Sequence, residues 1–319
     1  MRTLQTVIAL ALAAWLGAAV TRAATEPPAW AYAIPPAPRS LPGSTLTFPL
    51  ANIRDAFGPA DWFPGDHPSM PEVVAKGRRP DVRACSLCHY PNGKGRPENA
   101  GVAGLPVSYF VQTMNDFRND TRKSAESRKA NTNVMIGFAK LTTREEDLAA
   151  AQYFAQQPYP RRVKVVESKT APKVRLQGGM HMAIPANEGG GMAPIPADEI
   201  IEVPEDNLRA EARDTHMSWT VYVPPGTLNR GKQVASKHQC ATCHGANFEG
   251  IGPVPPLAGR SVSYMMRQLF DMKTGARRGP WAELMKSAVT SMSVQDMAAV
   301  AALAASTQPP APPTTTSTR

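Results

Sequence analysis

Two short stretches of the chain combine cysteine and histidine in the same order. Residues 85–89 read Cys-Ser-Leu-Cys-His, and residues 240–244 read Cys-Ala-Thr-Cys-His. Two thiols at this spacing can add to the two vinyl groups of one porphyrin, and the histidine that follows then lies under the iron as its proximal ligand. The sequence therefore predicts two covalently bound haem c groups. The predicted attachment residues are Cys85, Cys88, Cys240 and Cys243, and the predicted proximal iron ligands are His89 and His244.

Other chemistries of paired cysteines fit the pattern less well. A structural zinc site needs a second pair of ligands at comparable spacing in the same domain, and neither stretch has one. A thioredoxin-like redox site needs a single motif within a βαβ unit, and that context is missing here. Haem attachment is the interpretation that uses every residue of both motifs.

Both motifs belong to a longer internal repeat. They are 155 residues apart (240 − 85), and the same offset carries Ala-Gly at 103–104 onto Ala-Gly at 258–259. Further along, Met135 corresponds to Met285 at an offset of 150 (285 − 135). The five missing residues fall in the polar segment 118–131, where a loop can shorten freely. We interpret the chain as a tandem duplication.

The elements that must position the motifs are expected to be helices, because apolar residues recur three and four apart. Acidic residues or capping signals mark the start of the last helix in each copy. The expected helices cover 71–77, 108–117 and 143–157 in the first copy, and 229–237, 263–272 and 293–306 in the second.

The expected fold is all-α, with two tandem haem-binding domains, which the resemblance described below identifies as cytochrome c domains, joined by a long, largely irregular connector. Within the connector, residues 163–167 and 200–203 are expected to form short extended pieces. The expected domains are a signal peptide 1–23, a Pro-rich N-terminal extension 24–69, a first haem domain 70–160, the connector 161–225, a second haem domain 226–306 and a disordered tail 307–319.

The N-terminus and the charge limit where the chain acts and what it contacts. An apolar run over 7–20 precedes a cleavage signal that ends at Ala23, which predicts a secreted, periplasmic protein. Membrane association is then expected only through a partner or an uncleaved signal. The net charge of +9 becomes +7 (33 − 26) after cleavage, and the basic residues are scattered. This pattern excludes a nucleic-acid-binding protein.

Over about 71–157 and 226–306, the chain resembles tandem class I bacterial cytochromes c of the di-haem cytochrome c4 type. The matching features are the two attachment motifs, the Ala-Gly pairs that follow them, and the methionine before each closing helix. The resemblance implies a helical fold around each haem and a methionine as the distal iron ligand. The connector and the N-terminal extension are not covered by it.

The resemblance assigns the distal ligands to Met135 and Met285, which occupy equivalent positions upstream of the last helix. Met292 is the nearest competitor in the second copy. In the connector, His181 between two methionines is an alternative ligand.

The resemblance also implies a proline carbonyl that accepts the hydrogen bond of the proximal histidine. Pro256 fits this position in the second copy, whereas the first copy has Gly101. A glycine carbonyl is held less rigidly, so the two haems are expected to differ in reduction potential.

Ligation by histidine and methionine saturates the iron and suits one-electron exchange. We therefore expect an electron carrier, not an enzyme, between a dehydrogenase or quinol-oxidising complex and a terminal acceptor. Its partners are expected to be redox proteins with an acidic docking face, because the chain is basic. The alternative is a di-haem redox enzyme, of the peroxidase or thiosulfate-oxidising type, with one open or unusually ligated haem.

Overall fold

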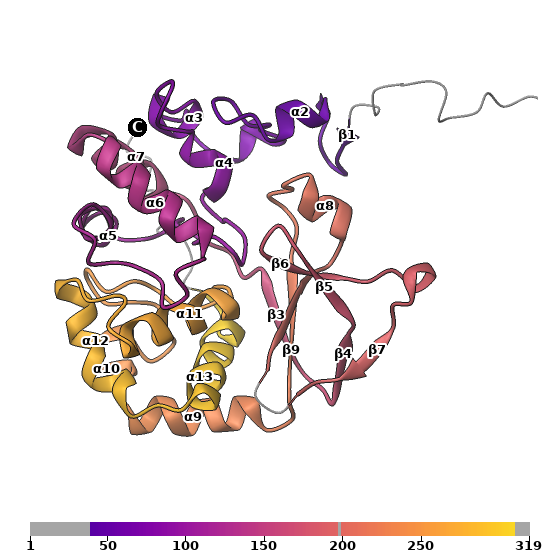
Figure 1. The fold of residues 1–319 in the computed structure, drawn as a ribbon, viewed down its shortest axis with the longest axis vertical. Coiled ribbons are helices and arrows are strands. Elements are labelled where there is room, and N and C mark those ends of the chain that lie inside the picture. The colour runs from indigo at the N-terminus through magenta and orange to yellow at the C-terminus, as the bar shows by residue number, and fades with distance from the viewer. Residues whose placement is uncertain (1–38, 197–198, 310–319) are drawn as a thin grey trace, which may run out of the picture. The chain divides into compact units, whose positions relative to one another are not determined.

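The computed structural model describes residues 39–196 and 199–309 (Figure 1). The expected signal peptide at 1–23, the first part of the extension and the tail from residue 310 lie outside the described residues. The described residues belong to one compact unit of the chain. Within the described part of it, two helical regions are joined by a region of strands.

The helices of the first copy surround the first motif. α7 begins with a capping box between Thr143 and Glu146, as the acidic first turn predicted. The predicted helices at 71–77, 108–117 and 143–157 are confirmed within a few residues, whereas the helix that carries Met135 was not predicted. The helices are α3 (Glu72–Ala75), α4 (Cys85–His89), α5 (Val107–Arg118), α6 (Ala130–Leu141) and α7 (Arg144–Ala155).

The second copy repeats this order of helices. α13 begins with a capping box between Ser293 and Asp296 and packs against α9. The two helices approach closely because Gly231 faces the carbonyl of Ala299, where an added Cβ would lie at 2.4 Å. The helices are α9 (Thr227–Lys237), α10 (Ala241–His244), α11 (Val262–Lys273), α12 (Pro280–Thr290) and α13 (Val294–Ser306).

The prediction of an all-α fold is wrong, because the connector folds into strands. The strand β9 pairs in parallel with β3 and antiparallel with β8. The hairpin β5–β6 and the antiparallel pair β4–β7, which encloses that hairpin in the chain, complete the region. The short helix α8 (Asn207–Glu211) lies between β8 and β9 in the chain. The strands are β3 (Val163–Glu167), β4 (Thr170–Pro172), β5 (Val174–Gln177), β6 (Met180–Ala183), β7 (Met192–Pro194), β8 (Ile201–Pro204) and β9 (Trp219–Val223).

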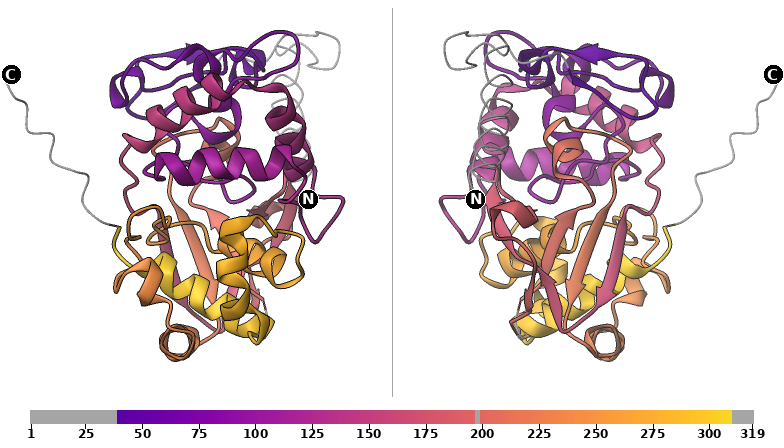
Figure 2. Two further views of the ribbon diagram at one scale, coloured as in Figure 1. Left: turned by 90° about the vertical axis from the view of Figure 1, so that its left-hand side faces the viewer. Right: turned by 90° about the vertical axis from the view of Figure 1, so that its right-hand side faces the viewer.

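The connector is therefore an ordered β-region and not the largely irregular segment that was expected. The side chains of β9 alternate between buried and half-buried, which is the pattern of a strand with one covered face. Val163, Val221 and Val223 join the apolar core of the second copy, so that α13 lies against β3 (Figures 1 and 2). The extended pieces predicted at 163–167 and 200–203 correspond to β3 and β8.

The described part of the N-terminal extension packs on the connector. It contains β1 (Arg39–Ser40), β2 (Thr47–Phe48) and α2 (Leu50–Ile53). Trp62 is fully buried there, and its indole Nε1 donates a hydrogen bond of 2.7 Å to the carbonyl of Ala212. The extension and the connector thus share one small apolar core.

Among the described residues, no single helix has the length and hydrophobicity of a membrane span. The helices α12 and α13 reach that threshold only when taken together, and they are bent by 116° with respect to each other.

Candidate haem sites

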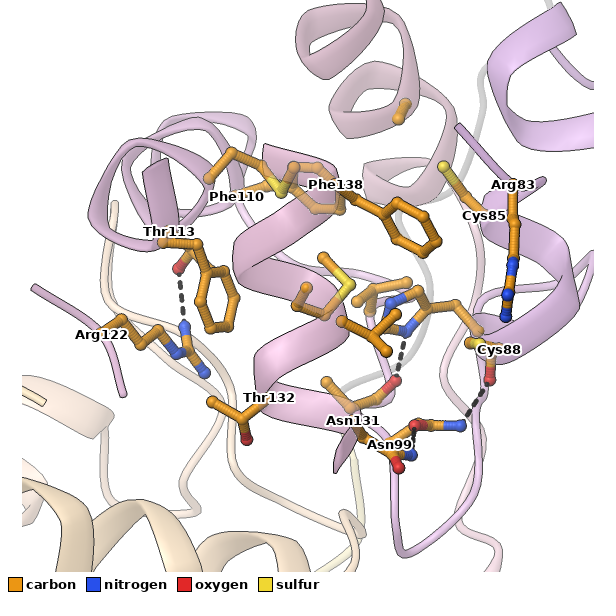
Figure 3. A pocket seen from close by; sticks show the side chains of 18 of the residues that line it. Arg83, Cys85, Cys88, Asn99, Phe110, Thr113, Arg122, Asn131, Thr132 and Phe138 are labelled. Atoms are coloured by element: carbon orange, nitrogen blue, oxygen red, sulfur yellow. Dashed lines mark hydrogen bonds between the residues drawn. The ribbon is translucent and has the colours of Figure 1, made fainter. Parts of the chain in front are cut away.

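The first copy encloses a cavity of about 350 Å³ between α4, α5, α6 and α7. Its lining includes Cys85, Cys88, His89 and Met135, so the structure brings the predicted attachment residues and both predicted iron ligands of this copy together. Figure 3 shows Cys85, Cys88 and Phe138 around this cavity. Most of the remaining wall is apolar, which suits the porphyrin of a haem.

His89 is oriented by the loop that follows the motif. Its Nδ1 donates a hydrogen bond of 2.8 Å to the carbonyl of Ala100, which leaves Nε2 for the iron. Burial lowers the pKa of His89, so the ring is neutral and available as a ligand. The prediction that Gly101 supplies this carbonyl is wrong by one residue, because the Gly101 carbonyl accepts from the guanidinium of Arg260.

His244 repeats this arrangement in the second copy. Its Nδ1 donates to the carbonyl of Pro255 at 3.1 Å, and burial lowers its pKa. The prediction of Pro256 is also wrong by one residue, since the Pro256 carbonyl accepts from Arg260 Nε. The sequence pattern predicted which loop contacts each histidine. It did not predict which carbonyl of that loop accepts the hydrogen bond.

The cysteines of the two copies differ in burial. Burial raises the pKa of Cys85 to about 12 and also raises the pKa of Cys88. Cys240 is half-buried with a raised pKa, and Cys243 is exposed. None of the four forms a disulfide, so all four thiols are free to form thioethers.

The distal side of the first cavity holds two thioethers. Met135 on α6 and Met114 on α5 both line it, and both belong to one apolar cluster with Phe117. His89 is the one histidine among the described residues that line this cavity, so His181 is not in its wall. The assignment of Met135 as the ligand stays a prediction.

The second copy leaves its two candidate methionines in different environments. Met285 on α12 is half-buried against the apolar core of this copy, whereas Met292 is 1% exposed and belongs to that core. A fully packed methionine is the expected filler of a core. Met285 therefore stays the predicted ligand.

The first cavity also contains arginine side chains that suit the carboxylates of a haem. Arg96, Arg122 and Arg213 line it, and in the described part of the chain Nε and Nη1 of Arg213 are buried without a hydrogen-bond partner. Unpaired buried donors are costly, and the two propionate carboxylates of a haem would satisfy them. When bound, the haem supplies an iron that exchanges one electron between Fe(III) and Fe(II).

A reciprocal contact joins the two copies. Arg122 donates to the hydroxyl of Tyr264 at 2.8 Å, and Arg277 donates to the hydroxyl of Tyr109 at 2.9 Å. Both arginines also donate to the side-chain carbonyl oxygen of Gln268. Arg122 and Arg277 are 155 residues apart, as are Tyr109 and Tyr264, so the repeat offset was the signal that could have found this contact.

The arginines change the acidity of the tyrosine that they surround. Burial would raise the pKa of Tyr109, but the positive charges of Arg277, Arg122 and Arg260 and the hydrogen bond from Arg277 together lower it to about 8. The buried carboxylates of Asp116 and Asp271 lie near the same arginines and offset part of their charge.

Arg260 is an asymmetric link between the proximal loops. It donates to the carbonyl of Pro256 in its own copy, and to the carbonyls of Gly101 at 2.6 Å and Ala103 at 2.9 Å in the first copy. Its guanidinium also lies over the ring of Tyr159, 4.3 Å from the centroid. The equivalent position of the first copy, Leu105, cannot make these contacts.

Among the described residues, no group of three or more histidine, cysteine, aspartate and glutamate side chains is arranged to hold a metal ion directly. Each motif presents one imidazole and two thiols, which is the donor set of a covalently attached haem.

The comparisons with known proteins agree with this geometry. Residues 228–308 match the family described as Cytochrome c. The thiosulfate dehydrogenase electron acceptor of Stutzerimonas stutzeri is 40% identical over 229 residues, which cover 70% of this chain and 79% of that protein.

Two solved structures match the chain at low identity and low structural similarity. The cytochrome c4 of Acidithiobacillus ferrooxidans is 21% identical with a TM-score of 0.43, covering 70% of this chain and 97% of its own. The thiosulfate dehydrogenase TsdBA of Marichromatium purpuratum is 22% identical with a TM-score of 0.45, covering 74% of this chain and 39% of its own.

The chain belongs to the cytochrome c family. It is a c-type cytochrome that binds covalent haem c and carries electrons.

Proposed function

We propose that the chain carries two haem c groups and accepts electrons from a periplasmic dehydrogenase. It passes them on to a terminal acceptor and catalyses no substrate reaction of its own. The observation that carries the proposal is the first cavity, where two thiols, an oriented imidazole and a thioether line one apolar space. The second copy repeats the motif and the orientation of its histidine.

Thiosulfate dehydrogenase is the proposed donor. The support is the 40% identity to a protein whose name describes it as the electron acceptor of that enzyme. The net charge of +9 for the whole chain favours a donor with an acidic docking face. Export to the periplasm rests on the N-terminal signal pattern.

In this function the chain's own residues fix the haem and keep the iron saturated. Ala100 and Pro255 hold the two imidazoles by their Nδ1 atoms, so each presents Nε2 to an iron. Met135 and Met285 are proposed to occupy the opposite positions. A saturated iron gives peroxide or a sulfur anion no coordination site, so the chain can exchange electrons without binding a substrate.

Stopped-flow spectroscopy tests this function. The oxidised protein is mixed with thiosulfate dehydrogenase and thiosulfate, with controls that omit either one. Both haems are expected to be reduced only in the complete mixture. The rate is expected to fall with salt, as the screening length shortens from about 10 Å at 0.1 M to about 3 Å at 1 M.

Two results would contradict the proposal. Failure of the complete mixture to reduce the protein would exclude thiosulfate dehydrogenase as the donor. Turnover of thiosulfate or peroxide by the isolated chain would favour the di-haem enzyme instead.

A further inference from the structure

The attachment segments of the two copies differ sharply in exposure. At the offset of 155 residues, Asn92 corresponds to Asn247, and the first is buried while the second is exposed. Leu87 is likewise buried, whereas its counterpart Thr242 is exposed. Because the same residue type stands at 92 and 247, the difference arises from what covers each segment and not from the segment itself.

The connector covers the segment of the first copy. Lys94 Nζ donates to the carbonyl of Thr215 at 3.4 Å, and Arg162 donates to the carbonyl of Gly95 at 3.3 Å. The β5–β6 turn presses on the same loop, since a Cβ added at Gly179 would lie 3.2 Å from the side chain of Glu98. The edge of the first haem site beside Cys88 is therefore enclosed by the chain itself.

The second segment is open, small and uncharged over most of its length. Its exposed residues are Gln239, Ala241, Thr242, Cys243, Ala246, Asn247, Ile251, Gly252 and Pro253. Such side chains allow another protein to approach the attachment site closely without removing charges from water. Electron transfer needs this close approach of two redox centres.

Positive charge flanks the open segment. The helix α9 leads directly into it and carries the exposed Lys232 and Lys237 and no acidic residue. Its Arg230 is paired with Asp296 at 2.9 Å, so the two lysines supply the free positive charge. An exposed patch whose one acidic residue, Glu249, accepts a hydrogen bond from the Asn247 backbone N–H, and which lies beside cations, is complementary to a protein surface with an acidic rim around its own redox centre. A second copy of this chain is an unfavourable partner for the patch, because it is also basic.

We infer that residues 239–253 form the docking surface for the acidic electron-donor protein, and that electrons enter at the second haem. The inference rests on the proposed function, because it locates the contact with the donor. In each encounter one electron leaves the donor's centre and reduces Fe(III) of the second haem to Fe(II). No bond forms or breaks, and the first haem is filled from the second within the chain.

Charge placed on this surface tests the inference. Asn247→Glu adds one negative charge to the open segment, and Ser127→Glu adds one to an exposed loop of the first copy as the matched control. Ala246→Glu is the second variant on the docking surface. Haem content and the reduced spectrum are measured first, so that a variant that fails to mature is replaced by the other.

Each variant is reduced by thiosulfate dehydrogenase with thiosulfate, and in a separate arm the reduced protein is oxidised by ferricyanide. Asn247→Glu is expected to lower both second-order rates at least fivefold at low salt, whereas Ser127→Glu leaves both within twofold. Equal rates for the three proteins in the ferricyanide arm would overturn the inference. If the dehydrogenase does not reduce the wild type, only the proposed donor is refuted. The ferricyanide arm still shows which surface exchanges electrons.

Light scattering distinguishes another occupant of the same surface. The wild type is expected to be monomeric. A dimer that Asn247→Glu dissociates would show that residues 239–253 bind a second copy of this chain, and this would also overturn the inference.

Discussion

The two copies share their chemistry and differ in their surroundings. Each has a histidine that donates from Nδ1 to a carbonyl eleven residues further along, Ala100 for His89 and Pro255 for His244. Each contributes one arginine and one tyrosine to the reciprocal contact between them. The connector covers the attachment segment of the first copy, whereas in the second copy it packs on α13 and leaves the attachment segment open. The difference shows that a duplicated site can acquire a new role through what covers it while its ligands stay the same.

The largest expected effect comes from removing the predicted distal ligands one at a time. Reduced wild-type protein is expected to bind no carbon monoxide, whereas Met135→Ala and Met285→Ala each open one iron and bind one equivalent. Met285→Ala is expected to react faster, because the attachment segment of its copy is exposed. Carbon monoxide titration of the visible spectrum measures both.

Met114→Ala is the control for the first copy, because Met114 lines the same cavity from α5. It is expected to bind no carbon monoxide. An unchanged spectrum for Met285→Ala would assign the ligand role in the second copy to Met292. Carbon monoxide binding by Met114→Ala, with none by Met135→Ala, would assign the ligand role in the first copy to Met114.

Arg260 tests the asymmetric link between the copies. Arg260→Leu introduces the residue type of the equivalent position, Leu105, and leaves the carbonyls of Gly101, Ala103 and Pro256 without this donor. The expected loss is about 2–4 kcal/mol in the free energy of unfolding. Guanidinium unfolding of the haem-loaded protein measures it.

Arg161→Leu is the matched control, because Arg161 is exposed and its loss should change stability by less than about 0.5 kcal/mol. If the two variants were equally stable, Arg260 would not hold the proximal loops together.

The reciprocal contact is expected to respond equally from both sides. Tyr109→Phe removes one acceptor of Arg277, and Tyr264→Phe removes one acceptor of Arg122. Each arginine keeps Gln268, so each variant is expected to lose about 1.5 kcal/mol of stability. A large loss in one variant with none in the other would show that the contact is reciprocal in geometry only.

The smallest expected effect is a pH dependence in the extension that packs on the connector. The side-chain hydrogen bond to Asp61 raises the pKa of His67, and the two side chains lie 3.1 Å apart. A raised pKa in the folded protein means that this pair stabilises fully below the ordinary value of 6.5. The stabilisation is lost as the pH rises through the folded pKa.

His67→Gln is expected to lower stability by about 1 kcal/mol at pH 5.5 and by less at pH 8.5. Thermal unfolding at the two pH values measures this. An equal loss at both values would show that packing, and not the ion pair, is what His67 contributes.

Much of the haem chemistry was predictable because it depends on local spacing. The Cys-x-x-Cys-His order and the offset of 155 residues predicted both motifs, and capping signals at Thr143 and Ser293 predicted where two helices begin. The predicted carbonyl partners of the two histidines were wrong by one residue. The direction of a loop backbone depends on distant contacts such as those of Arg260.

The prediction of an irregular connector was wrong for a different physical reason. β3 and β9 pair in parallel although more than fifty residues separate them, and local composition carries no signal of such a partner. The prolines and glycines at 185–196 favour an irregular segment when they are read alone. Pairing across the connector outweighed that preference, and it also produced the cover over the first copy.

The central claim is that both motifs carry a covalent haem in one electron-carrying chain. The most direct measurement is the intact mass of the denatured, secreted protein. The account predicts the polypeptide from residue 24 plus two haems. A mass with one haem or none would contradict it.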